Sequence, residues 1–224
     1  MDKNKTVLVI APHLDDEALG CGGVISSHVD RGNKVCVCFV AHRVYNHVYD
    51  AKKMEIEKKH SMKAKEIMGY HESCFLDLND ERLDLCIQDI IIPLEDYLIK
   101  TRPQIVYSPF CNDNNQDHQA VAKAVQVVLR PSAVPFVERW MIFETPSSTD
   151  QGPLVGTFGF QANVYYDIGN HIDKKLEAIA SYKTESRPYP NPRSPDGIKA
   201  LAMKRGMECG LNYAESFMLA REKV

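Results

Sequence analysis

Apolar residues along the chain form short continuous runs that alternate with longer amphipathic stretches. The runs are rich in β-branched residues, as expected for strands buried on both faces of a parallel sheet. These predicted strands span residues 6–11, 34–41, 73–78, 105–108 and 139–144, with 162–168 as a sixth. The intervening stretches have helical spacing and cover residues 17–31, 52–68, 85–100, 118–129, 170–182 and 194–211.

Strands that alternate with helices predict an α/β fold, because parallel neighbours need crossover connections. Right-handed crossovers favour a Rossmann-like, doubly wound and mostly parallel sheet, with strand order about 3-2-1-4-5 and helices on both faces. Pro93 predicts a kink or break in the third helix. We expect one domain over residues 1–224, in which a proline-rich segment, 187–195, leads to a terminal helical part.

Composition narrows the function only by exclusion. The 224 residues carry a net charge of -3, which gives no basic surface for nucleic acid. No apolar run approaches the roughly 20 residues that span a bilayer, and the N-terminal residues resemble no export signal. Seven scattered cysteines indicate reduced thiols and a cytoplasmic protein. Cys36 and Cys38 share one face of a strand and are expected to be small core residues.

Two polar segments follow the first and fourth predicted strands: residues 12–17 and 112–118. In an open α/β sheet, ligands bind beyond the carboxyl ends of the strands, where the strand order reverses. Strands 1 and 4 are neighbours across that point in the predicted order. The topology therefore brings the two segments together.

Together the two segments supply the residues of a catalytic zinc site. Two histidines and one carboxylate, here His13, Asp16 and His118, leave one position of the metal open for water. Zinc lowers the pKa of a bound water toward about 7, and another divalent metal could occupy the same ligands. Asp15 stands beside this set and is placed to accept the proton of that water.

Each segment also has a purely structural interpretation. Asp15, Asp16 and Glu17 form a good N-terminal cap for the following helix. Asp117 and His118 similarly fit a cap and a first helical turn. The metal interpretation is favoured because both segments follow strands that are predicted to be adjacent, and because together they complete one ligand set.

The segment VLVIAPHLDDEALGCGG (residues 7–23) resembles the hallmark of the PIG-L (LmbE-like) deacetylases, A-H-P-D-D-E followed by glycines. Residues 115–118 match part of the family's second motif, H-x-D-H. Near the C-terminus, Arg205-Gly206 and residues 213–217 resemble its closing R-G and Y-A-E-x-F. The resemblance spans most of the chain.

This resemblance implies zinc on His13, Asp16 and His118, with Asp15 as the general base. It further implies hydrolysis of an N-acyl amide, usually the N-acetyl group of an amino sugar or its conjugate. The expected partner is thus a small N-acylated sugar. A homo-oligomer is compatible with the sequence.

The chain departs from the family pattern at two positions. Leu14 replaces a proline, which should change only the stiffness of the turn. Asn115 replaces a histidine that is paired with an aspartate like Asp117, and an amide cannot transfer a proton. The general acid is therefore unassigned, with Asp15 in a double role or His42, at the end of strand 2, as candidates.

Three further residues are candidates for substrate binding. Arg43 follows strand 2 and could hold a phosphate or carboxylate of the substrate, although a surface arginine is the simpler interpretation. Arg205 and Tyr213, in the closing motifs, could shape a substrate pocket or a subunit contact.

Other functions compete with deacetylation. Gly20-Cys21-Gly22-Gly23 invites a dinucleotide-binding interpretation, but Ile25 occupies the third glycine's place and no acidic residue ends strand 2. The glycines are expected instead to let the first helix pack closely. An N-deformylase or another amidohydrolase would use the same residues, and a non-catalytic sugar- or metal-binding protein would use the same fold.

Overall fold

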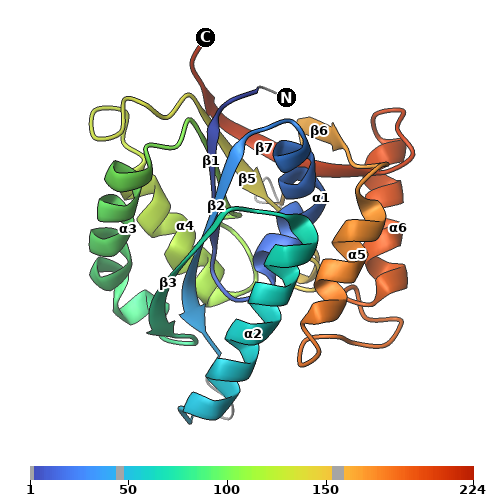
Figure 1. The fold of residues 1–224 in the computed structure, drawn as a ribbon, viewed down its shortest axis with the longest axis horizontal. Coiled ribbons are helices and arrows are strands. Elements are labelled where there is room, and N and C mark those ends of the chain that lie inside the picture. Colours follow the sequence, from blue (N-terminus) through green and yellow to red (C-terminus); the bar gives the residue numbers. More distant parts are fainter. Residues whose placement is uncertain (1–2, 44–47, 153–158) are drawn as a thin grey trace.

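The computed structural model describes residues 3–43, 48–152 and 159–224, and within these residues the strands form one seven-stranded sheet (Figure 1). The strands are β1 (Thr6–Ala11), β2 (Lys34–His42), β3 (Glu72–Asn79), β4 (Ile105–Pro109), β5 (Arg139–Phe143), β6 (Val164–Asp167) and β7 (Ala214–Glu222). The helices are α1 (Asp16–Asp30), α2 (Ala51–Met68), α3 (Ile87–Thr101), α4 (Gln116–Val128), α5 (Ile172–Ser181) and α6 (Pro195–Met207). Short 3₁₀ turns lie at Leu83–Leu85 and Thr149–Gln151.

The strand order is β3-β2-β1-β4-β5-β7-β6, and the five strands from β3 to β5 are parallel. The predicted order 3-2-1-4-5 and the α/β class are confirmed. The structure adds β7, which pairs antiparallel with β5 and β6 and was missing from the sequence prediction. Its outer half is only partly buried and ends in charged residues, so it lacks the continuous apolar run of the central strands.

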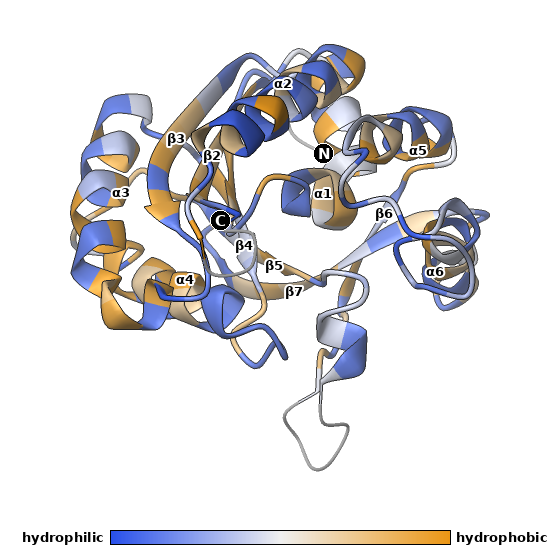
Figure 2. Cartoon of the chain, turned by 90° about the horizontal axis from the view of Figure 1, so that it is seen from below, coloured by the Kyte–Doolittle hydropathy of each residue, from blue (hydrophilic) through white to orange (hydrophobic). Residues whose placement is uncertain are grey.

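Helices cover both faces of the sheet, as expected (Figure 2). Alternate residues of β1 divide between the two cores: Val9 packs with α1, α2, α5 and α6, whereas Ile10 packs with α3 and α4. Both side chains are fully buried. The central strands are therefore apolar on both faces, which leaves the loops at the strand ends as the place for polar groups.

The glycine cluster in α1 allows the helix to approach its neighbours closely. A Cβ atom on Gly20 would lie 2.4 Å from Phe143, and one on Gly23 would lie 2.6 Å from Ile168. A buried ion pair joins α5 to β7, because Lys175 Nζ lies 2.5 Å from Glu215 Oε1. The same carboxylate oxygen accepts a hydrogen bond from the Gly23 amide and so connects α1 to this pair. The glycines thus serve packing, as expected.

The two cysteines of β2 are core residues, as expected. Cys36 and Cys38 are buried on the face toward α3 and α4, and Cys38 lies opposite Cys74 in the neighbouring strand. Helix α3 continues through Pro93 without a break. Among the described residues, no helix combines the length and apolar character needed to cross a membrane.

Candidate active site

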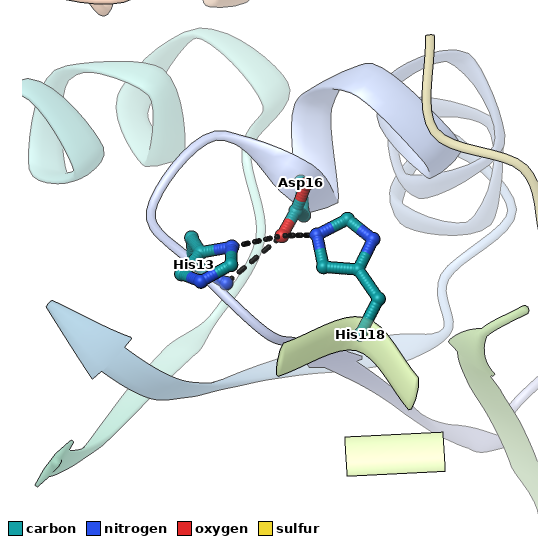
Figure 3. Close-up of side chains that lie close together, drawn as sticks. All are labelled: His13, Asp16 and His118. Atoms are coloured by element: carbon teal, nitrogen blue, oxygen red, sulfur yellow. Dashed lines mark hydrogen bonds and ion pairs between the residues drawn. The ribbon is translucent and has the colours of Figure 1, made fainter. Parts of the chain in front are cut away.

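The two polar loops meet at the carboxyl edge of the sheet because β1 and β4 are direct neighbours, with Val9 paired to Tyr107. His13 lies in the loop after β1, and Asp16 is the first residue of α1. His118 lies in the first turn of α4. Figure 3 shows the three side chains directed at one point. The sequence therefore positions them through strand order and short loops.

The Asp16 carboxylate stands at the centre of this cluster. Its Oδ2 atom lies 3.3 Å from His13 Nδ1 and 3.2 Å from His118 Nε2 (Figure 3). The same oxygen accepts a 2.9 Å hydrogen bond from the backbone amide of His13. Asp16 and His118 are fully buried, and the His13 side chain is about one-fifth exposed. One carboxylate thus faces two imidazoles, with access from the His13 side.

Two further carboxylates lie behind the imidazoles, one against the far nitrogen of each ring. Asp117 Oδ2 lies 3.1 Å from His13 Nε2, and Asp113 Oδ2 lies 3.4 Å from His118 Nδ1. Asp113 in turn accepts hydrogen bonds from Ser148, Thr149 and the backbone amide of Asn115. Carboxylates behind histidines in this way fix the orientation of the ring and raise its basicity.

The carboxylates make the cluster attractive to positive charge. Burial works against protonation of His13, but hydrogen bonds to Asp117 and Asp16 outweigh it and raise the pKa of His13 to about 10. In His118 the charge of Asp16 and the bond to Asp113 outweigh burial and raise the pKa to about 9. The two imidazoles hold the pKa of Asp16 well below its usual value despite burial. Protons, or a metal cation in their place, are strongly favoured here.

The donor set fits a divalent metal. One ligand atom each from His13, Asp16 and His118 lie within 4.8 Å of one another. The second oxygen of Asp16 is buried and has no hydrogen-bond partner among the described residues, and a bound cation would satisfy it. Two imidazoles and a carboxylate with one open position are typical of catalytic zinc. His13, Asp80 and Asp117 form an alternative group within the same distance limit.

Asp15 lies beside this cluster and has an unusual backbone. Its φ is 140° and ψ is -24°, a conformation that costs energy for a residue with a Cβ atom. Its side chain does not cap α1; instead Oδ2 accepts a 2.8 Å hydrogen bond from Arg193. Burial raises the pKa of Asp15 to about 7, although the charge of Arg193 opposes the shift. The capping interpretation therefore does not account for Asp15.

A cavity of about 480 Å³ opens above the cluster, and both His13 and Asp15 line it. Two sets of charged side chains share its surface. We call Arg43, Arg187 and Arg193, with Glu185 among them, the arginine group; we call Asp80, Glu81 and Asp117 the acidic group. The arginine group adjoins Asp15 through Arg193, and the acidic group adjoins His13 through Asp117.

The three residues that the sequence suggested as assisting catalysis, Asn115, Asp117 and His42, lie in different surroundings. Asn115 lines the cavity, but its side-chain oxygen caps α4 by accepting from the Asp117 amide at 2.8 Å. Asp117 contacts His13 and also accepts a hydrogen bond from the Glu81 amide. It thereby connects the loop after β1 to the loop after β3. His42 is buried at the end of β2 with its ring edge-on to Tyr49, and it is not among the residues that line the cavity.

The three suggested substrate residues separate in the structure. Arg43 lines the cavity and pairs with Glu185. Arg205 instead forms a two-pronged ion pair with Glu144, at 2.7 and 2.6 Å, and takes no part in lining this cavity. Tyr213 lines a separate hollow near the end of α6. Only Arg43 is therefore brought to the candidate site.

The sequence analysis did not predict that residues in and beside the proline-rich segment line the cavity. Arg193 and Arg187 belong to residues 187–195, and Glu185 precedes them. The signal available in the sequence was a stiff segment that carries two arginines, but nothing in its pattern indicates which strand end it crosses. Asp113 was also missed as the residue behind His118, although it lies within the predicted polar loop.

The α/β fold with a histidine–aspartate cluster at its switch point is suited to metal-dependent chemistry, and comparison with known proteins supplies the family. The chain belongs to the PIG-L family, described as GlcNAc-PI de-N-acetylase, whose model matches residues 8–129. The uncharacterized deacetylase YaiS of Escherichia coli K12 is 31% identical over 191 residues, which cover 82% of this chain and 93% of that protein. The chain is therefore a hydrolase that acts on amide bonds, as the sequence predicted.

Solved structures extend the likeness to the fold. The N,N'-diacetylchitobiose deacetylase of Pyrococcus horikoshii superposes with a TM-score of 0.75 at 20% identity, covering 96% of this chain and 83% of that one. GalB, the 4-carboxy-2-hydroxymuconate hydratase of Pseudomonas putida, superposes with a TM-score of 0.79 at 22% identity, covering 98% of both chains. Proteins named for different reactions thus share this fold, so the likeness of fold alone does not identify the substrate.

Proposed function

We propose that the chain is a zinc-dependent N-deacetylase that releases acetate from an N-acetylated amino sugar or sugar conjugate. The observation that carries the proposal is the convergence of His13, Asp16 and His118, with their ligand atoms within 4.8 Å. Deacetylase names among the relatives, including one for a chitobiose derivative, support an acetylated amino sugar as the substrate class.

His13, Asp16 and His118 would hold the metal, and Asp117 and Asp113 would orient the two imidazoles. When bound, zinc supplies a water of lowered pKa and polarises the amide carbonyl of the substrate. Asp113 and Asp117 must stay charged to orient the two imidazoles. Hydrogen bonds to the histidines lower the pKa of Asp113 and Asp117 despite their burial, so both are ionised at neutral pH.

Asp15 is the proposed general base. It lines the cavity and stands next to a metal ligand in the chain, and burial raises its pKa to about 7. A base of matched pKa accepts a proton from the attacking water most efficiently. The ion pair with Arg193 holds the Asp15 carboxylate in one position, which favours a single geometry for the transfer.

Asp15 is also the proposed source of the proton that the departing amine needs. After it takes a proton from water, its carboxyl lines the same cavity as His13 and can donate that proton to the amine. Asn115 cannot fill that role, because an amide has no proton to transfer and its oxygen is bound to the α4 backbone. The same carboxyl would then act first as base and afterwards as acid.

The proposal is tested by acetate release from a panel of N-acetylated amino sugars, disaccharides and nucleotide sugars, with N-formyl analogues in parallel. Protein stripped with a chelator and then reloaded with zinc or magnesium provides the matched controls. We expect acetate from at least one sugar with zinc-loaded protein and none after stripping. Full activity without metal would overturn the metal role, and hydrolysis confined to the formyl analogues would make the chain a deformylase.

A further inference from the structure

We propose that the arginine group is a subsite for an anionic substituent, a phosphate or carboxylate, carried by the substrate. That the ligand is an amino sugar rests on the function proposed above. The subsite itself rests on three guanidinium groups that gather around one carboxylate at the surface of the cavity. Arg43, Arg187 and Arg193 come from two distant parts of the chain to reach it.

Glu185 is the shared partner of the three guanidinium groups. Arg43 Nη1 pairs with its Oε1 atom, while Arg187 Nη2 and Arg193 Nη1 lie 3.5 and 3.6 Å from its Oε2 atom. Distances of 3.5 Å and more are too long for strong hydrogen bonds. One carboxylate therefore engages the last two guanidinium groups only loosely, and an incoming anion can offer them better-placed oxygens.

The Arg187 guanidinium is held in place by the backbone. Its Nη1 atom donates to the backbone carbonyls of Thr184 and Ser186, at 2.7 and 3.1 Å. The side chain is nevertheless 39% exposed, and the residue lines the cavity. A guanidinium held by backbone groups and open to solvent loses little conformational freedom when it binds a ligand.

Arg193 links the proposed subsite to the chemistry. It donates from Nη1 to Asp15 and from Nε to Ser147, at 2.8 and 2.6 Å. Glu185 and Arg193 connect Arg43 and Arg187 to Asp15: Arg193 Nη1 lies 3.6 Å from Glu185 Oε2 and 2.8 Å from Asp15 Oδ2. The anionic substituent would thus be on the same sugar, or its direct conjugate, as the acetamido group that is hydrolysed.

Guanidinium groups suit this ligand class because their planar donors match the oxygens of phosphate and carboxylate. A neutral sugar would gain no comparable benefit from these guanidinium groups. We therefore expect the subsite to raise the affinity for a phosphorylated amino sugar about tenfold over the neutral sugar. The neutral sugar should bind equally well with and without the arginines.

The test is calorimetric titration of glucosamine, glucosamine 1-phosphate and glucosamine 6-phosphate into the intact protein. These ligands carry no acetyl group, so the outcome does not depend on deacetylase activity. The variants are Arg43→Gln, Arg187→Gln and the double variant, each at a partly exposed position. Arg130→Gln is the matched control, because Arg130 pairs with Glu95 on α3 and does not line the cavity.

We expect at least one phosphorylated sugar to bind about tenfold more tightly than glucosamine, and the double variant to abolish that preference while Arg130→Gln keeps it. Titrations of metal-free and zinc-loaded protein separate the arginines from the metal as the anion ligand. Equal binding of neutral and phosphorylated sugars would overturn the proposal. So would a preference that needs zinc and survives in the double variant.

Discussion

The candidate site combines two regions that differ in almost every physical respect. The metal-binding region comprises the loops after β1 and β4, and its central side chains, Asp16 and His118, are fully buried. The arginine group lies on and beside irregular chain between α5 and α6, and Arg43 and Arg187 are about two-fifths exposed. The first region is fixed by adjacent strands of the sheet, whereas the second is held by turns and ion pairs.

This difference suits the metal-binding region to the chemical step and the arginine group to recognition of the substrate. Buried carboxylates and imidazoles at the strand ends have little freedom to move, as a metal site requires. Arg43 and Arg187 are open to a ligand, and substitutions there leave the strand ends untouched. The ion pair of Arg193 with Asp15 connects the two regions. Perturbing each region in turn should therefore give separable effects.

The largest effect is expected from Asp15→Asn in the metal-binding region. The amide keeps the size of the side chain but cannot accept the proton, so turnover should fall by about 10²-fold or more while zinc content is retained. Asp84→Asn, at an exposed position outside the cavity, is the control and should be neutral. Turnover and zinc are measured on the same preparations. An Asp15→Asn protein with full turnover would show that Asp15 is not the base.

A smaller effect is expected from Asp113→Asn, behind His118. The amide removes the charge that fixes the imidazole, and such substitutions weaken metal binding by about 10–100-fold. Competition with a zinc chelator measures the affinity. Asp89→Asn, on the exposed side of α3, serves as the control. Unchanged zinc affinity in the Asp113 variant would mean that His118 is held without this carboxylate.

Arg193→Gln probes the contact between the two regions. Arg193 favours the charged form of Asp15 and so opposes the rise in pKa that burial causes. Its removal should raise the pKa of Asp15, and the ascending limb of the pH profile of kcat/KM should move to higher pH by about one unit. Arg130→Gln is expected to leave the limb in place. If the ascending limb of the Arg193→Gln variant stayed at the same pH, Arg193 would not influence the titration of Asp15.

The smallest effect is expected from Asn115→Ala. Its side chain caps α4, so its removal should lower the free energy of unfolding by about 1 kcal/mol. Turnover should change by no more than a few-fold, as in Asp50→Ala, which removes the cap of α2. Chemical denaturation and turnover are measured for both variants. A large loss of turnover at unchanged stability would give Asn115 a catalytic role.

The contrast between the regions also explains what the sequence could predict. Thr6–Ala11 and its parallel neighbours have continuous apolar runs, and those runs determine the strand order that brings His13 and His118 together. Asp15 and Asp16 followed from their place in the first loop. This part of the site is local to strand ends, so pattern and topology were sufficient.

The parts of the fold and site that the sequence did not predict depend on long-range packing, which local patterns do not encode. β7 was missed because it is antiparallel and half-exposed, and α6 ends before it at Met207. Arg193 is 178 residues from Asp15 in the chain, and no periodicity links them. Arg205 has the residue type of a ligand-binding side chain, yet it is satisfied by Glu144, a pairing that only the folded structure reveals.

The central claim is that one metal ion is held by His13, Asp16 and His118. Anomalous scattering from crystals of zinc-loaded protein, recorded on both sides of the zinc absorption edge, tests it most directly. We expect one strong peak at about 2.0–2.2 Å from a ligand atom of each residue. A peak among His13, Asp80 and Asp117 instead, or fully active crystals without any peak, would contradict the account.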